Sequence, residues 1–333
     1  MPYRYVSFQS KFLAAGLCLL LTGVQADSIT LPNGDVYEGD MLGNERHGKG
    51  EYTWVDGNRY VGDFITNTMH GQGVYTWLDG REYVGSFVSD RREGQGKLTW
   101  PNGDSYEGGF KADELHGEGQ FIWANKDRYE GTFVNGQRTG KGRFSWANGS
   151  TYEGDFENGT LQGTGVFTWL DGRRYEGEFK QGAQQGVGIL TWPNGNRYVG
   201  QFNANIRQGL GVFYWRDGTI YRGQFDQGTM QGWGVKLLPD GGQEVQLWSA
   251  GKLQETRQLQ IFDQCSLRFA DRDWMFESSS CINGLAHGEG IAASLDGDML
   301  IKDGRYVLGE VVAGDVINLP EPDVSSDTAE AEG

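Results

Sequence analysis

The sequence has little proline, no cluster of basic residues and few long apolar runs, and each absence excludes a class of protein. Only 7 prolines accompany 54 glycines, so the chain is neither collagen nor a proline-rich linker. The formal net charge is −16, and without clustered lysine and arginine the chain is poorly suited to nucleic acid or to an anionic membrane surface. What the sequence does contain is aromatic residues, at 13%, which is too many for a disordered chain.

The first 26 residues predict a secretory signal peptide. Arg4 and Lys11 precede a short apolar run at 12–21, and Ala26 offers a cleavage site before Asp27. The run is too short to span a bilayer as an ordinary helix, and no other segment is apolar enough to do so. We therefore expect cleavage after Ala26 and a periplasmic or extracellular location, in the envelope of a bacterium.

Cysteine is scarce, and signal cleavage would leave two residues, Cys265 and Cys281. An even count in an exported chain predicts a disulfide between them. A metal pair is less favoured because His287 is the only histidine near them in the sequence. Their separation is also too long for a paired-thiol redox centre.

A motif of 23 residues dominates the chain, and each copy begins with tyrosine. Counted from that tyrosine, positions 3, 12 and 14 are glycine, position 5 is phenylalanine except for Met41, and position 18 is tryptophan in all copies but the last. Position 20 is aspartate or asparagine, and position 21 is glycine except for Lys126. The nine copies begin at Tyr37, Tyr60, Tyr83, Tyr106, Tyr129, Tyr152, Tyr175, Tyr198 and Tyr221.

Each copy predicts a β-hairpin. Large apolar residues and glycine alternate with polar residues at positions 1–5 and 14–18, which is the period of a strand, and the glycine content excludes helix. Proline at position 19 of three copies favours a three-residue loop that pairs position 18 with position 22. Position 8 holds only Asn, Asp or Gly and predicts a second turn with positive φ, while Lys126 predicts strain or an altered loop. We expect the glycines at positions 3, 12 and 14 to lie beneath aromatic rings.

These residues resemble the MORN (membrane occupation and recognition nexus) repeat, whose consensus is YxGxF…GxGxxxWxDG. The resemblance covers about residues 29–243 and implies an all-β fold, an elongated twisted antiparallel sheet of repeated hairpins. At ~10 Å per repeat, nine repeats extend roughly 90 Å. The resemblance also implies association with proteins or membranes.

We expect four segments: a signal peptide (1–26), the repeat array (29–243), a small β-rich cap with a degenerate repeat (244–318) and a disordered acidic tail (319–333). Outward positions of the last three copies turn apolar, and either the cap or another protein could cover them. This apolar patch consists of Val187, Ile189, Leu210, Val212, Trp233 and Val235.

No residue set predicts catalysis, a metal site or a cofactor. The histidines His47, His70, His116 and His287 all occupy position 11, but copies ~10 Å apart cannot easily share one ion. The glutamates at position 2, Glu107, Glu130, Glu153 and Glu176, are interpreted as a solvated face with no pocket. An activity in the C-terminal segment is the least favoured alternative, and mutation of Asp271, Asp273 or His287 would test it.

The tryptophans of position 18 remain the candidate binding residues. Packing within the sheet accounts for most of the surface of the tryptophan rings. The part of each ring that stays exposed could bind an extended polymer by stacking. We therefore expect a non-enzymatic exported protein that binds or scaffolds an unidentified protein. The alternative is a cell-wall glycan binder, and the oligomeric state is open. The candidate residues are Trp54, Trp77, Trp100, Trp123, Trp146, Trp169, Trp192 and Trp215.

Overall fold

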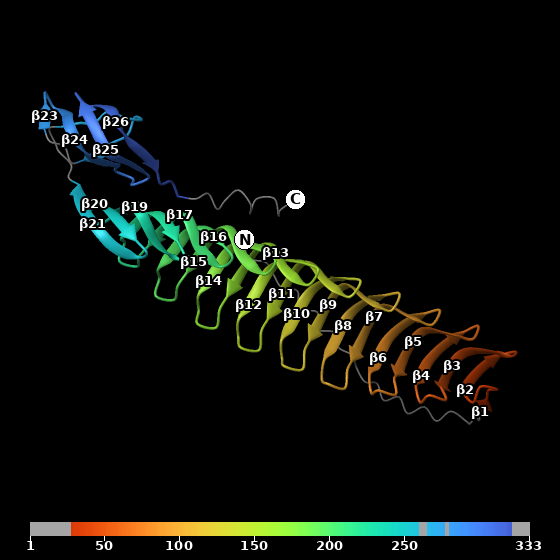
Figure 1. Cartoon of the computed structure of the whole chain (residues 1–333). Coiled ribbons are helices and arrows are strands. Elements are labelled where there is room, and N and C mark those ends of the chain that lie inside the picture. The colour runs from red at the N-terminus through yellow and green to blue at the C-terminus, as the bar shows by residue number, and fades with distance from the viewer. Residues whose placement is uncertain (1–27, 260–264, 277–279, 322–333) are drawn as a thin grey trace.

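The computed structural model describes residues 28–259, 265–276 and 280–321, all of them in strands, turns or loops. The predicted signal peptide at 1–26 and residues 322–333 of the predicted tail lie outside this part of the chain. The described residues form one long sheet and one small sheet (Figure 1). None of them forms a helix long and apolar enough to span a lipid bilayer. The predicted all-β class is confirmed.

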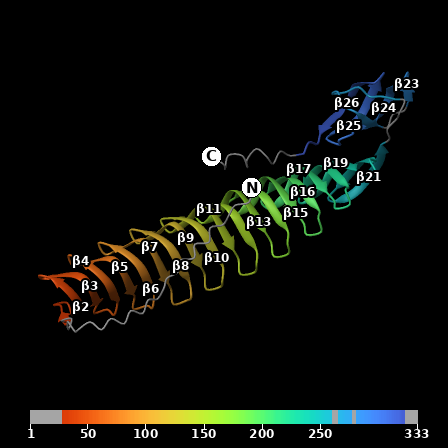
Figure 2. The same ribbon diagram turned by 180° about the vertical axis from the view of Figure 1, so that it is seen from behind.

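The long sheet has 21 strands, and each strand pairs antiparallel with the next one in sequence. Its strands are β1 (Ser28–Thr30), β2 (Val36–Leu42), β3 (Glu45–Thr53), β4 (Arg59–Ile65), β5 (Thr68–Thr76), β6 (Glu82–Val88), β7 (Arg91–Thr99), β8 (Ser105–Lys111), β9 (Glu114–Ile122), β10 (Arg128–Val134), β11 (Gln137–Ser145), β12 (Thr151–Glu157), β13 (Thr160–Thr168), β14 (Arg174–Lys180), β15 (Ala183–Thr191), β16 (Arg197–Asn203), β17 (Ile206–Tyr214), β18 (Ile220–Asp226), β19 (Thr229–Leu237), β20 (Gln243–Ser249) and β21 (Lys252–Leu259). Both views show a single layer that twists along its length (Figures 1 and 2).

The loop at positions 19–21 has the predicted register. Trp54 N–H donates to the carbonyl of Asn58 at 2.9 Å, which pairs position 18 with position 22, and Gly57 has a φ of 92°. Lys126 keeps the same loop, because its N–H donates to Trp123 O at 2.8 Å. Its φ of 75° shows that the predicted strain is in the lysine backbone and that the loop is not rearranged.

The second turn is a two-residue loop at positions 7 and 8, and both residues have positive φ. Thr66 and Asn67 are typical, at 48° and 67°. Position 8 was expected to have this conformation, and it does in eight of the nine copies. Position 7 was not expected to, because residues such as Thr66 and Gln181 carry no preference for it.

The tyrosine at position 1 is the centre of each repeat. Its ring lies on the glycines of positions 3 and 14, so that a Cβ placed on Gly50 would be 2.5 Å from the Tyr37 hydroxyl oxygen. All nine of these tyrosines are at most 1% exposed. Phenylalanine at position 5 packs edge-on against two of them; Phe87, for example, lies 5.1 Å from both Tyr60 and Tyr83 between ring centroids. The rings form a continuous chain that joins each repeat to the next.

Position 12 differs from this prediction. Its glycine carries no ring but has a positive φ, such as 60° at Gly71, where the pairing of the two strands shifts register. In five copies the side chain at position 4 closes this bulge; the Asp63 carboxylate, for example, accepts the N–H of Gln72 at 2.9 Å. A backbone bulge therefore explains why position 12 is glycine in every copy. Our expectation that a ring lies on this glycine was wrong.

Arginine at position 10 is a further link between repeats. The guanidinium of Arg138 donates to the turn carbonyl of Gly159 in the next copy at 2.6 Å and lies over the ring of Phe144, 5.2 Å from its centroid. Burial lowers the pKa of Arg138. The same bond to the next turn is made by Arg46, Arg92 and Arg207.

Side chains at position 8 also accept hydrogen bonds from the preceding repeat. Asn67 Oδ1 accepts from Arg46 N–H at 2.9 Å, whereas Gly136 has no side chain to offer Leu115. Gly136→Asn should therefore raise the free energy of unfolding by about 1 kcal/mol, since asparagine tolerates the φ of 76° and adds a hydrogen bond. Urea unfolding measures this, with Gly136→Ala as the control that strains the turn without adding an acceptor.

The small sheet contains β22 (Trp274–Phe276), β23 (Ser280–Ile282), β24 (Leu285–Ser294), β25 (Met299–Val307) and β26 (Glu310–Asn318). The turn Asn283–Gly284 has positive φ at both residues, like the second turn of the repeats. The boundaries differ at both ends from those expected. The hairpin β20–β21 extends the long sheet to Leu259, and Leu319, which we assigned to the tail, is 1% exposed within the cap.

Candidate binding surfaces

The aromatic face of the long sheet carries the predicted tryptophans, and all eight are half-buried. Trp54 lies between Tyr52 and Tyr75, with ring centroids 4.6 and 5.2 Å away. The tryptophan rings therefore pack against the aromatic residues of position 16, whereas the tyrosine rings of position 1 lie on the backbone of the glycines. Arginines cover four of them further; Arg81, for example, lies over Trp77 and Arg173 over Trp169.

The opposite face is defined by positions 2, 4, 13, 15 and 17, and a single row of side chains crosses it. Position 2 of each strand lies directly across from position 15 of both neighbours, as Val61 does from Glu51 and Val74. The row therefore runs the length of the sheet at one side chain per strand. From β2 to β20 its members are Glu38, Glu51, Val61, Val74, Val84, Lys97, Glu107, Gln120, Glu130, Arg143, Glu153, Val166, Glu176, Ile189, Val199, Val212, Arg222, Val235 and Val245.

The cap covers the C-terminal end of this row. Val235 and Val245 are fully buried in a cluster with Met275, Leu300 and other aliphatic residues of the cap. The Gln243 amide donates to the carbonyl of Ser294, at the end of β24, at 3.0 Å and to that of Leu295 at 2.8 Å. The predicted cover of the apolar patch by the chain's own C-terminal segment is confirmed for this end.

The last described residues continue along the same face. Ile317 and Leu319 join the cluster under the cap, and the Glu321 carboxylate lies 3.9 Å from the Arg197 guanidinium. Burial, together with the hydrogen bond that Tyr214 donates to Glu321, raises the pKa of this tyrosine to about 12. An extended segment with two aliphatic side chains, Ile317 and Leu319, followed by the Glu321 carboxylate thus lies on the opposite face.

Removing the cap should expose this apolar surface. A chain ending at Leu259 loses the partners of Val235 and Val245, so it should bind the dye ANS more strongly than the full chain does. Fluorescence titration measures the change. The substitution Val166→Thr, on the same row outside the cap, serves as the control, and dye binding that stays equal in the truncated and full chains would contradict the covering role.

None of the residues that the structure describes covers the N-terminal end of the row, and this end is hollowed. A depression of about 600 Å³ lies over strands β2–β6. Val61, Val74 and Val84 lie along it, and Val84 is 45% exposed. The backbone of four glycines contributes to its surface, and charged side chains border it at one end. We call it the valine hollow. Sequence reasoning missed it, although valine at position 2, where glutamate is commoner, was a visible signal.

The titratable side chains considered for catalysis are separate from one another. At position 2, Glu107 lies across from Lys97 at 4.0 Å and Glu130 is paired with Arg128 at 2.8 Å, so cations alternate with the carboxylates. His70 Nδ1 accepts from Ser89 N–H in the next repeat at 3.5 Å, which is a structural link. Within the described ranges, no group of three or more His, Cys, Asp or Glu side chains could hold a metal ion.

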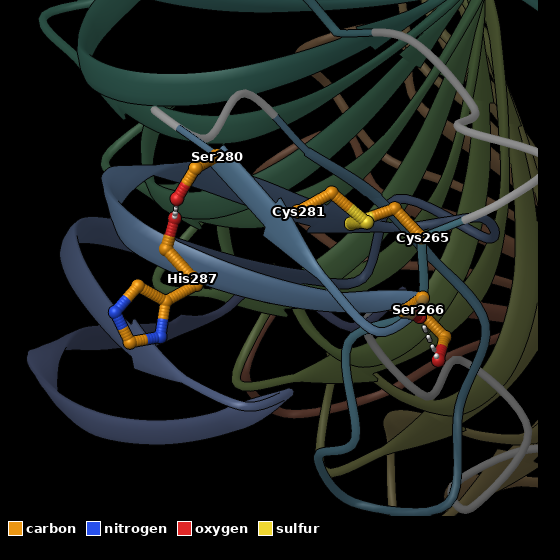
Figure 3. The surroundings of a disulfide bond; sticks show 6 residues. Cys265, Ser266, Ser280, Cys281 and His287 are labelled. Atoms are coloured by element: carbon orange, nitrogen blue, oxygen red, sulfur yellow. Dashed lines mark hydrogen bonds between the residues drawn. A yellow bond between two sulfur atoms is a disulfide. The ribbon is translucent and has the colours of Figure 1, made fainter.

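The predicted disulfide joins Cys265 and Cys281, whose Cα atoms are 5.9 Å apart. It ties the start of the cap to β23, and Ser280 donates to the His287 carbonyl on the neighbouring strand at 2.9 Å (Figure 3). The His287 ring points away from the sulfur atoms in this view. Disulfides of this kind are typical of an oxidising compartment.

Comparisons with known proteins identify the repeat. The family described as MORN repeat matches nine segments, which cover more than half of the chain: 37–59, 60–80, 83–105, 106–128, 129–151, 152–172, 175–197, 198–220 and 221–243. No curated protein matched.

Among solved structures, the chain is similar to the TCP domain of Drosophila melanogaster SAS-4 in complex with a proline-rich motif of Ana2, at 16% identity and a TM-score of 0.33, over 53% of this chain and 90% of that one. It is also similar to the TCP10 domain of Danio rerio CPAP, at 10% identity and a TM-score of 0.27, over 69% and 99%. The TM-scores are low, so these likenesses bear on neither partner nor function.

Proposed function

Because this chain belongs to the MORN repeat family, whose repeats indicate a binding or scaffolding role, we propose that it is a non-enzymatic protein that binds another protein along the opposite face. The main support is that a continuous row of side chains crosses this face and that the cap covers only the C-terminal end of the row. Nothing in the described ranges covers the part from β2 to β14, which leaves it open to a partner. Its mixture of valines with charges of both signs suits a protein surface better than a lipid surface.

Site-specific cross-linking tests this proposal. A photoreactive residue at Gln120, in the middle of the open row, should give a discrete protein adduct in cells, and one at Val55, on an exposed loop, should not. If the opposite face gave no adduct above that control, protein binding along it would be refuted.

Glycan binding on the aromatic face is the second candidate, and it is favoured by the eight half-buried tryptophans at one per repeat. Peptidoglycan fragments or capsular polysaccharide should then quench tryptophan fluorescence. Trp146→Phe keeps the packing against Phe144 and Phe167 and should weaken quenching, whereas unchanged fluorescence in the native chain would exclude this function.

We also propose that the protein acts in the periplasm or outside the cell. The support is the signal-peptide pattern at 1–26 and the disulfide. N-terminal sequencing of the protein from the envelope fraction should find Asp27 as the first residue. A full-length, reduced protein in the cytosol would contradict this location.

A further inference from the structure

The valine hollow and the capped end of the opposite face are built on the same row. Val235 and Val245 are fully buried beneath the cap and Val212 is fully buried near them, whereas Val74 is half-buried and Val84 is 45% exposed. At the capped end, an extended segment with aliphatic side chains at Ile317 and Leu319 and a carboxylate at Glu321 covers aliphatic and basic groups. The molecule itself therefore shows what kind of chain suits this row.

The charge at the hollow is of the opposite sign. The two cations beside it are already paired, Lys49 with Asp63 at 2.6 Å and Arg59 with Glu51 at 2.5 Å. Glu38 and Asp40 make no ion pair with any part of the chain that the structure describes, although Asp40 accepts the N–H of Lys49. Two uncompensated carboxylates thus border the aliphatic surface.

The hollow also has a defined length. From Glu38 on β2 to Val84 on β6 the row crosses four strand spacings of ~4.8 Å, or ~19 Å. An extended segment of about six residues covers this distance. Glycine backbone at Gly39, Gly50, Gly62 and Gly73 forms part of the surface of the hollow.

We propose that the valine hollow binds an extended segment of a partner protein in which aliphatic side chains lie on Val61, Val74 and Val84 and a lysine or arginine lies against Glu38 and Asp40. This inference rests on the proposed function and names the chemistry of the partner. Apolar contact supplies affinity, and the two carboxylates select against acidic segments and fix the direction of the chain.

A phage-displayed library of random heptapeptides tests the proposal on the full chain. Peptides selected on the native protein, and counter-selected on Val84→Lys, should combine aliphatic residues with lysine or arginine. The matched control is Val166→Lys, which makes the same change on the same row outside the hollow. Anisotropy with the leading synthetic peptide should show at least about tenfold weaker binding to Val84→Lys and to Glu38→Lys, and unchanged binding to Val166→Lys.

Three results would overturn the proposal. These are the absence of any peptide that distinguishes the native chain from Val84→Lys, enrichment of acidic peptides, and a tenfold gain in affinity on deleting residues 322–333, which would mean that the chain's own end fills the hollow. If Val84→Lys lost the peptide but kept the protein adduct at Gln120, the partner would not depend on the hollow, and this inference would fail while the proposed function remained. A native chain that gave neither an adduct at Gln120 nor a peptide selective for the hollow would refute the two together.

Discussion

Between about pH 10 and about pH 12, the repeat array should unfold in one steep step. Burial raises the pKa of Tyr83 and Tyr129 to about 12, and it raises the pKa of the equivalent tyrosines of most other copies further. Tyrosine in the unfolded chain loses its proton near pH 10, so in this window the unfolded state binds fewer protons than the folded one. The free energy of unfolding must then fall as the pH rises, by about 2–3 kcal/mol for each tyrosine by pH ~12.

Circular dichroism and tyrosinate absorbance, followed together against pH, measure this transition. The two signals should change at the same pH, because the buried hydroxyls ionise only when the array opens. In Tyr129→Phe the transition should release one proton fewer, at the cost of the hydrogen bond to Thr132 O. Tyrosinate that formed near pH 10 while the dichroism stayed constant would show that the tyrosines are not buried as described.

Gly142→Ala should be among the most damaging small substitutions in the array. A Cβ on Gly142 would lie 2.5 Å from the hydroxyl oxygen of Tyr129, whose ring cannot move away because Phe133 and Phe156 pack against it. We expect a loss of about 3 kcal/mol in the free energy of unfolding. Since each repeat contacts only its neighbours, the array should open first between the fifth and sixth copies.

Urea unfolding and limited proteolysis of Gly142→Ala test both parts of this expectation. Gly136→Ala is the matched control, because its Cβ meets nothing within 4 Å and only its φ of 76° is unfavourable. It should cost about 1 kcal/mol and leave the cleavage sites unchanged. If the two variants lost the same free energy of unfolding, the contact between the tyrosine ring and glycine would not be a main source of the array's stability.

Much of the fold could be predicted because its determinants lie within one copy. Alternation gave the strands, and the proline at position 19 gave the three-residue loop that places Trp54 across from Asn58. Lys126 was correctly identified as a strained position, since lysine has no tolerance for positive φ. The cover of the apolar patch was also predictable, because Val212 and Val235 would otherwise be aliphatic residues on a solvated face.

The remaining features depend on contacts between copies, which a single copy does not reveal. Glycine at position 12 looks like the glycines at 3 and 14, and only the register shift at Gly71 distinguishes a bulge from a ring contact. The hairpin β20–β21 was assigned to the cap because it lacks the tyrosine and glycines of the repeat. Val61, Val74 and Val84 are far apart in sequence, and they become neighbours only through the pairing of three strands.

The single-layer array fixes a distance as well as a surface. The valine hollow ends at β6 and the capped cluster begins at β17, and each 23-residue copy between them adds ~10 Å. Removing one complete copy would bring these two places closer by that step without altering either. The number of copies therefore sets the distance between the valine hollow and the capped cluster. A change in that number alters this distance and leaves both surfaces as they are.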